Sequence, residues 1–345
     1  MILAGPPSMQ PDLPLPFTTA RSTSWQSLWR DAIRDPRELL ALLDLDGMVA
    51  GVCDSAAAQF PLRVPRGFVD RMRRGDIGDP LLRQVLPISA EMAIMPGYGL
   101  DPVGDAQART GTGMIRKYRG RLLLIATGSC AIHCRYCFRR HFPYADETAS
   151  HDRWHSAIQT VRDDETIEEI ILSGGDPLSL VTARLEELTT ALAALPHVKR
   201  LRIHSRLPIV LPERIDDDLI SWLNRLPWPI TFVVHANHAN EFTADVDAAL
   251  ARLRATGATL LNQTVLLRGV NDYLQALTDL SERGFAAGVL PYYLHQLDHA
   301  RGTAHFEVTD TDARRLHAEL TARLSGYLVP RLVREIPGGT SKHPL

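Results

Sequence analysis

From residue 121 onward, short apolar runs alternate with longer segments in which apolar residues recur every three or four positions. Short apolar runs between turn residues indicate buried strands, and the longer periodic segments indicate amphipathic helices. The predicted strands are Arg121–Thr127, Glu169–Ser173, Val198–His204, Ile230–His235, Thr259–Leu267 and Val289–Gln296. Helical segments between them, including Leu180–Leu195, Asp216–Leu226 and Ala244–Thr256, indicate parallel strands with right-handed crossovers. The pattern therefore predicts an α/β fold, a partial (β/α)6 barrel that does not close with eight strands.

The pattern before residue 106 is different. Residues 1–22 are rich in Pro, Ser and Thr, which predicts a poorly ordered N-terminus. Residues 23–105 read as an N-terminal helical region, with Trp25, Leu28, Trp29 and Ile33 at helical spacing and a capping signal at Asp35-Pro36-Arg37-Glu38. The barrel is then expected over 106–330, and residues 331–345 form a separate C-terminal segment.

Composition narrows the class of protein. The 345 residues are 45% apolar and 23% charged with a net charge of −2, which is typical of a soluble globular protein and gives no sign of a nucleic-acid partner. No apolar run is long enough for a membrane span, and no signal peptide is apparent. Three of the four cysteines are clustered, so we expect a reducing, cytoplasmic environment in place of a disulfide framework.

The clustered cysteines carry the first chemical signal. Cys130, Cys134 and Cys137 have the spacing C-x3-C-x2-C and directly follow the first predicted strand of the barrel. Three thiolates from one loop suit three irons of a [4Fe–4S] cluster and leave the fourth iron open. On spacing alone, buried thiols or a redox pair are equally good interpretations. Zinc normally needs a fourth ligand, which His133 would have to supply from inside the loop. The fourth cysteine, Cys53, is expected to be a small buried residue.

A strand that delivers a cysteine loop at its C-terminal end resembles the radical S-adenosylmethionine (SAM) superfamily. The second predicted strand ends in Ser173-Gly174-Gly175-Asp176. This run by itself describes a common turn, but in this position it resembles the superfamily segment that contacts SAM. His235 and Gln263 end the fourth and fifth strands. The resemblance implies SAM contacts for both, although each would also serve as an ordinary loop residue.

The C-terminal segment carries the second signal. It reads Gly338-Gly339-Thr340-Ser341-Lys342-His343-Pro344. A lysine so close to a chain end is most often a solvated charge. A glycine-rich hairpin leading to Lys-x-Pro nevertheless resembles the pyridoxal-phosphate (PLP) lysine of the lysine 2,3-aminomutases. Lys342 would then form the Schiff base with PLP.

The resemblance to the lysine 2,3-aminomutase family extends over roughly 60–345. It is carried in addition by four further runs: residues 117–121, 205–212, 262–272 and 291–298. It implies the isomerisation of L-lysine to β-lysine with a [4Fe–4S] cluster, SAM and PLP. It also implies a one-electron reductant of the flavodoxin or ferredoxin type.

The family pattern assigns further roles residue by residue. Lys117, Tyr118 and Arg121 match the stretch that binds the PLP phosphate, for which cations and a phenol are suited. Arg139 would bind the substrate carboxylate as a bidentate fork, unless it is a surface arginine like its neighbour. Asp298 and Glu335 match the two positions that hold the ε-ammonium of lysine, a charge pattern that disfavours glutamate as substrate.

Two departures refine the resemblance. Position 335 is glutamate where free-standing aminomutases usually have aspartate, and the chain is expected to lack their C-terminal extension because it stops three residues after Lys342. Both departures resemble the EpmB subfamily, which makes β-lysine, as the (R) isomer, for modification of elongation factor P and so has a functional link to its ligase. The alternatives left open are a free-standing catabolic or osmolyte-producing aminomutase, a non-catalytic iron–sulfur electron carrier and a zinc-binding structural module.

Overall fold

The computed structural model describes residues 24–147 and 151–345, so the expectation for residues 1–22 lies outside the described residues. Its centre is a ten-stranded sheet in which spatial order follows chain order. Seven neighbouring strands, β3 to β9, are all parallel. Their bounds are β3 Arg121–Thr127, β4 Glu169–Gly174, β5 Arg200–Ser205, β6 Ile230–Val234, β7 Thr259–Val265, β8 Leu290–His295 and β9 Arg331–Arg334. All six predicted strands are present, and β9 is an additional one.

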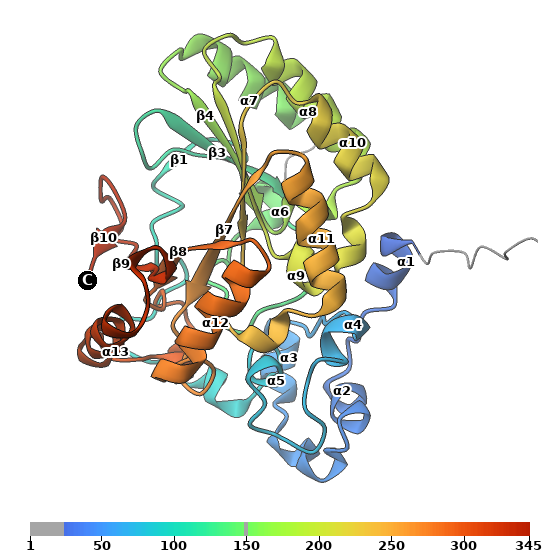
Figure 1. Ribbon diagram of the computed structural model, residues 1–345, viewed down its shortest axis with the longest axis vertical. Coiled ribbons are helices and arrows are strands. Elements are labelled where there is room, and N and C mark those ends of the chain that lie inside the picture. The colour runs from blue at the N-terminus through green and yellow to red at the C-terminus, as the bar shows by residue number, and fades with distance from the viewer. Residues whose placement is uncertain (1–23, 148–150) are drawn as a thin grey trace, which may run out of the picture.

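Helices connect the parallel strands and lie outside the sheet (Figure 1). The connecting helices are α7 His151–Asp163, α8 Thr182–Ala193, α10 Asp217–Arg225, α11 Ala244–Ala255, α12 Leu274–Ala286 and α13 Asp310–Arg323, with short helices α6 Tyr144–Glu147 and α9 Leu207–Val210. In α10, the Asp216 side chain caps Leu219 N and Arg225 lies in the last turn, which suits the helix dipole. Six βα units followed by β9 confirm the α/β partial (β/α)6 barrel.

Short antiparallel strands border the parallel set on both sides. On one side β1 Arg109–Gly111 and β2 Met114–Ile115 pair onto β3. On the other, β10 His343–Pro344 pairs with β9. The described residues therefore form an open sheet in which β3 and β9 do not pair directly.

The N-terminal region consists of short helices beside the barrel, drawn in blue in Figure 1. They are α1 Trp25–Arg30, α2 Pro36–Leu42, α3 Asp54–Gln59, α4 Arg66–Val69 and α5 Pro80–Arg83. The Asp35 cap is present, but Glu38 forms an ion pair with Arg66. Ile33 lies beyond the end of α1, in a bridge to Val64, so the predicted helical periodicity extends one turn too far.

The helical region and the barrel share one continuous hydrophobic core. Phe68 and Leu81 of the helical region are fully buried in the same cluster as Leu172, Ile203 and Phe232 of the barrel strands. Burial of this kind contributes about 1.5–3 kcal/mol for each large side chain. Burial of apolar side chains therefore stabilises the contact between the helical region and the barrel, as it stabilises the interior of each.

A buried ionic cluster adds to this connection. Glu91, just before the barrel, pairs with Arg135 Nη2 at 2.5 Å and with Arg140 Nη2 at 2.8 Å, and all three side chains are at most 2% exposed. Arg135 also donates to the carbonyl oxygens of Phe60 and Ala56. Because both arginines belong to the loop that carries the cysteines, this cluster fixes that loop against the helical region.

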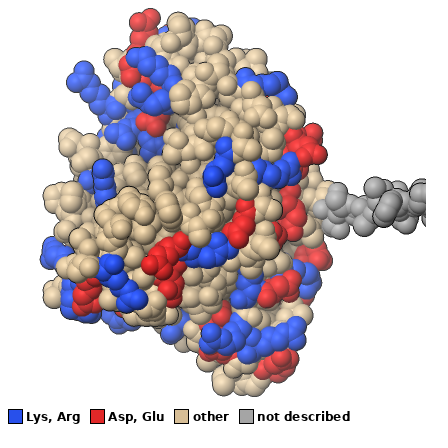
Figure 2. All heavy atoms as spheres, viewed as in Figure 1, with Lys and Arg blue, Asp and Glu red and all other residues tan. Residues whose placement is uncertain are grey.

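The face of the molecule seen in Figure 2 shows no strong bias of charge. Figure 2 shows basic and acidic side chains interspersed on the viewed face, in keeping with the net charge of −2. Exposed ion pairs such as Lys199–Glu168 and Arg252–Asp217 are of the kind that contributes little to stability. Within 24–147 and 151–345, no helix is both long and apolar enough to cross a bilayer.

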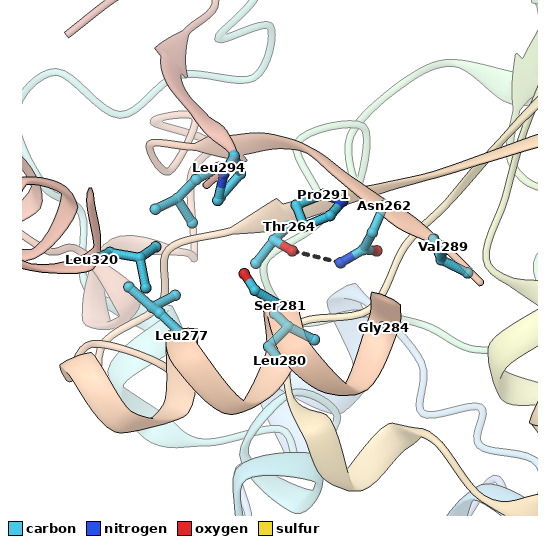
Figure 3. Close-up of a pocket in the computed structure, with 11 residues that line it drawn as sticks. Asn262, Thr264, Leu277, Leu280, Ser281, Gly284, Val289, Pro291, Leu294 and Leu320 are labelled. Atoms are coloured by element: carbon cyan, nitrogen blue, oxygen red, sulfur yellow. Dashed lines mark hydrogen bonds between the residues drawn. The ribbon is translucent and has the colours of Figure 1, made fainter. Parts of the chain in front are cut away.

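A small cavity lies between the sheet and its outer helices (Figure 3). It has a volume of about 10 Å³ and is lined by Asn262 and Thr264 of β7 and by Leu277, Leu280 and Ser281 of α12, among others. Asn262 Nδ2 donates to Thr264 Oγ1 at 2.9 Å. A cavity of this size holds about one water molecule at most, so it is a packing feature and not a ligand site.

Candidate active site

A cavity of about 500 Å³ opens inside the barrel, toward the carboxyl ends of the parallel strands. All sixteen residues singled out in the sequence line it: Lys117, Tyr118, Arg121, Cys130, Cys134, Cys137, Arg139, Ser173, Gly174, Gly175, Asp176, His235, Gln263, Asp298, Glu335 and Lys342. Ligand sites of α/β proteins lie at this end of the strands. The volume is within the range of small-molecule and cofactor sites.

The cysteine loop follows β3 and is fixed by β4. Gly175 N donates to Thr127 O at 2.7 Å, and Asp176 N donates to Ser129 O at 2.8 Å. A Cβ on Gly175 would lie 2.5 Å from Ser129 O, and one on Gly174 would lie 2.7 Å from Thr127 O. The absence of side chains at these two glycines therefore lets the end of β4 pack closely against the cysteine loop. The sequence did not indicate that this loop would be their neighbour.

Asp176 is a buried anchor of the second strand end. Its carboxylate accepts hydrogen bonds from Ser205 Oγ at 2.8 Å, Arg206 N at 2.7 Å and Leu178 N at 3.0 Å. Burial raises the pKa of Asp176 to about 6, against the lowering effect of these donors. The carboxylate thus ties β4 to the end of β5 and orients the backbone that faces the cavity.

Three histidines lie around the cavity at the strand ends. His235 follows β6, His204 belongs to β5 and His295 to β8; His204 and His235 rings meet edge to face at 5.8 Å. Burial lowers the pKa of His235 to about 4 and lowers those of His204 and His295 well below the usual value. All three are therefore neutral near pH 7, able to exchange hydrogen bonds with a ligand without adding charge.

Several of these side chains have buried polar atoms that no protein group satisfies. In the described residues they include His235 Nε2, His295 Nε2 and Gln263 Oε1. A buried polar atom without a partner costs about 1–3 kcal/mol. Because all three side chains line one cavity, a polar ligand bound there would remove that cost.

Arg139 and Lys117 meet at a buried carboxylate, Asp105. Arg139 Nε lies 2.7 Å from Asp105 Oδ2, Lys117 Nζ lies 2.8 Å from Asp105 Oδ1, and Arg139 Nη1 donates to Ser173 Oγ at 3.1 Å. Burial alone would raise the pKa of Asp105, but the charges of Arg139 and Lys117 hold it below the ordinary value. Asp105 therefore stays ionised and holds both cations at the cavity wall.

The C-terminal segment folds back into the cavity mouth. Gly338 has φ +74°, a conformation that glycine adopts without strain, and His343 then pairs with Arg334 across the β9–β10 ladder. At the end of the chain, Leu345 N donates to Leu332 O at 3.2 Å. The hairpin predicted from the glycines is present, and it places Lys342 inside the barrel mouth.

Lys342 lies among groups of opposite charge. Its Nζ is 2.9 Å from Glu335 Oε2 and 5.5 Å from the centroid of the Tyr293 ring. Glu335 Oε1 accepts from Tyr118 OH at 2.6 Å. Burial alone would raise the pKa of Glu335, but Lys342, Tyr118 and Lys117 hold it below the ordinary value. In this structure two ammonium groups pair with Glu335: that of Lys342, and that of Lys117, whose Nζ lies 3.6 Å from Oε1.

Asp298 lies on the same side of the cavity, after β8. Burial raises its pKa to about 7, against the lowering effect of the Lys342 charge, and the charge of Glu335 raises it further. The second carboxylate of the pair is therefore only partly ionised near neutral pH. A bound cation would restore its charge.

These residues fit the cofactors that the sequence suggests. The three cysteines, His235 and Gln263 all line the cavity. Lys342 and Tyr118 both contact Glu335, and the Arg121 guanidinium lies over the Tyr118 ring at 5.0 Å. His133 is engaged outside the cavity, with Nδ1 2.8 Å from Pro61 O and its ring stacked on Phe60. Among the described residues, no three His, Cys, Asp or Glu side chains converge on a single metal ion.

Some cavity residues were missed by the sequence analysis. His204 and His295 lie at strand ends, as His235 does, so the same positional rule would have identified them. Arg206 follows β5 directly and reaches the cysteine loop. Asp105 lies in an irregular segment without hydrophobic periodicity, and nothing in the local pattern distinguished it from the other acidic residues.

Comparisons with known proteins give a consistent result. No family model matches the chain. It is 49% identical over 332 residues to the L-lysine 2,3-aminomutase of Escherichia coli strain K12, covering 95% of this chain and 96% of that one. Identity to the protein of the same name from Haemophilus influenzae is 42%, covering 92% and 94%. For that of Clostridium subterminale it is 34%, covering 78% and 65%.

Among solved structures, a radical SAM methyltransferase from Sphaerobacter thermophilus aligns with a TM-score of 0.46 and 16% identity. The alignment covers 64% of this chain and 68% of that one.

Proposed function

Because the chain belongs to the lysine 2,3-aminomutase family, we propose that the cavity described above converts L-lysine to β-lysine. The protein is an isomerase of the radical SAM type that uses a [4Fe–4S] cluster, SAM and PLP. The observation that carries the proposal is the shared cavity, in which the cysteine loop and Lys342 line the same 500 Å³ space although they are about two hundred positions apart in the chain. An iron–sulfur electron carrier has no need of such a cavity.

The roles of the residues follow from their positions in the cavity. Cys130, Cys134 and Cys137 would hold the cluster, and Lys342 would hold PLP. When bound, the cluster and SAM supply a radical that removes hydrogen from the substrate, and PLP supplies a π system that permits migration of the amino group. The protein binds the lysine, orients it and excludes water.

The cofactor contacts divide between two parts of the cavity. Ser173, Gly174 and Gly175, whose backbone is positioned by Asp176, would hold SAM together with His235 and Gln263. Lys117, Tyr118 and Arg121 would supply the cationic and phenolic environment for the PLP phosphate. All of these residues line one cavity, so both cofactors would reach one substrate.

Charge determines how the substrate would lie. Arg139 would bind the substrate carboxylate, with Asp105 and Ser173 keeping its guanidinium oriented. Asp298 and Glu335 would bind the ε-ammonium. Glu335 pairs with the Lys342 ammonium in this structure, and attachment of Lys342 to PLP would leave that carboxylate for the substrate.

Loss of either carboxylate is expected to weaken lysine turnover strongly. In Asp298→Asn or Glu335→Gln, the substrate ammonium would be underpaired in a partly desolvated site, which costs about 2–5 kcal/mol. That range corresponds to a roughly 30- to 5,000-fold loss in kcat/KM. Steady-state kinetics with L-lysine measure it, with Glu307→Gln as the matched control because Glu307 is half-exposed and pairs with His299. Near-normal activity of both cavity variants would contradict the assignment.

The same assignment predicts a pH effect. The raised pKa of Asp298, about 7, means that acidification through pH 7 protonates this carboxyl and removes its attraction for the ammonium. The KM for lysine should therefore rise as the pH falls below about 7 in the unmodified enzyme. Asp298→Asn has no such group and should show a flatter KM profile over the same range.

We further propose that the β-lysine is the (R) isomer and serves the modification of elongation factor P. One observation supports this: position 335 is glutamate, where free-standing aminomutases usually have aspartate. Deletion of the gene should leave elongation factor P without its β-lysyl group, and added (R)-β-lysine should restore it. Chiral analysis of the purified enzyme's product gives the independent measurement. Full β-lysylation in the deletion strain would refute this role while leaving the isomerase intact.

A further inference from the structure

Arg206 makes a direct contact with one of the three cysteines. Its Nη1 lies 2.7 Å from Cys134 Sγ. The side chain is only 7% exposed, and the backbone N of Arg206 donates to Asp176 Oδ2 at 2.7 Å. The guanidinium is therefore delivered to the sulfur from a fixed strand end. A guanidinium is always protonated in proteins, so Cys134 receives a charged hydrogen-bond donor.

The opposite side of the guanidinium is held just as firmly. Arg206 Nη2 donates to Gln84 Oε1 at 2.8 Å and to Glu241 Oε2 at 3.0 Å. Gln84 in turn bonds to Glu241 Oε1 at 3.2 Å, and both are fully buried. This network joins the helical region, β5 and the segment after β6. It leaves the Nη1 group of Arg206 directed at sulfur.

We propose that Arg206 is a positioning residue that raises the reduction potential of the cluster through its hydrogen bond to Cys134. The inference rests on the proposed [4Fe–4S] cluster. Reduction adds one negative charge to a cluster, and hydrogen bonds to the cysteine sulfurs are among the factors that set its potential. A buried cation at one sulfur stabilises the reduced form more than the oxidised form. Arg206 thereby eases the electron uptake that must precede cleavage of SAM.

The test is a redox titration of the full chain with its cluster reconstituted anaerobically, without SAM, PLP or lysine. Electron paramagnetic resonance follows the reduced cluster, and iron and sulfide analysis measures its content. In Arg206→Gln we expect full cluster content and a reduced-to-oxidised ratio at least tenfold lower at a given potential. For a one-electron couple this is a shift of about 59 mV toward negative potential.

A second buried arginine provides the matched control. Arg71 is 4% exposed on its side chain and donates to the carbonyl oxygens of Ile209 and Glu241, without a contact to sulfur. Arg71→Gln should leave the potential unchanged. If Arg206→Gln does not assemble a cluster because Glu241 is left unpaired, the double variant Arg206→Gln/Glu241→Gln removes both charges. A negative shift is expected from it as well, smaller than in the single variant because loss of the Glu241 charge acts in the opposite direction.

The outcomes separate this inference from the proposed function. A full cluster with an unchanged potential in Arg206→Gln overturns the inference alone. Loss of the cluster in both the single and the double variant, with the fold retained by circular dichroism, also overturns it, because the arginine would then serve assembly and not potential. Failure of the unmodified chain to assemble a cluster would instead overturn the proposed cofactor.

Discussion

Replacement of Cys134 by alanine is expected to abolish reductive cleavage of SAM, lowering formation of 5′-deoxyadenosine by at least about three orders of magnitude. The same result is expected for Cys130→Ala and Cys137→Ala, because loss of one of three thiolates leaves a second iron without a protein ligand. Iron and sulfide analysis should show a depleted or absent cluster in each variant. The cavity wall formed by the loop should otherwise remain in place.

Cys53 provides the control within the same chain. It is half-buried in the helical region, its backbone N bonds to Pro87 O, and it is not among the cavity residues. Cys53→Ala should therefore keep full cluster content and activity. Full activity in Cys134→Ala, or loss of the cluster in Cys53→Ala, would contradict the assignment of ligands.

Loss of Lys342 is expected to have an effect of similar size. Without an amino group at this position, PLP has no attachment to the protein, and turnover of lysine should fall by at least about three orders of magnitude. The visible absorbance of the Schiff base should disappear in Lys342→Ala. In the unmodified protein, borohydride reduction should fix a pyridoxyl group on the C-terminal peptide.

The chain makes this labelling experiment unusually clear, since it contains only three lysines, Lys117, Lys199 and Lys342. Lys117 is held by Asp105 and by the carbonyl oxygen of Val103. Lys199 is exposed, pairs with Glu168 and does not line the cavity, so Lys199→Ala should label normally and is the control. A pyridoxyl group found on Lys117 or Lys199 would refute the assignment.

The sequence predicted the barrel well because its parallel strands carry buried apolar residues, in continuous runs as in β3 and β4 or in alternation as in β5 and β7. Runs such as Arg121–Thr127 are continuous in apolar residues and bounded by turn signals, so their limits are read to within a residue or two. The same logic places the side chains that follow β3, β4, β6 and β8 in one cavity, where all sixteen candidates meet. Strand β9 was missed because its four residues, Arg331–Arg334, contain only two apolar residues between two arginines, a run too short to stand out.

Partners within the cavity were much harder to predict. A sequence shows that Arg139 and Lys117 are cations, but not that one buried carboxylate, Asp105, engages both. The sequence analysis likewise assigned Glu335 and Lys342 to separate roles, whereas in the structure their side chains form an ion pair. Such contacts join segments that are far apart in the chain, and no local propensity or period encodes them.

The ionic cluster of Glu91, Arg135 and Arg140 makes the barrel dependent on the N-terminal helical region. A chain shortened to begin at residue 106 would keep every strand of the barrel, yet it would lose Glu91 and the carbonyl oxygens of Ala56 and Phe60. Breaking a buried pair by removing one partner costs about 3–5 kcal/mol, and here two arginines would lose one shared carboxylate. That amount is a large part of the total stability of a domain. The helical region is therefore required for the structure of the barrel. A barrel expressed without it would not keep the cysteine loop in its present conformation.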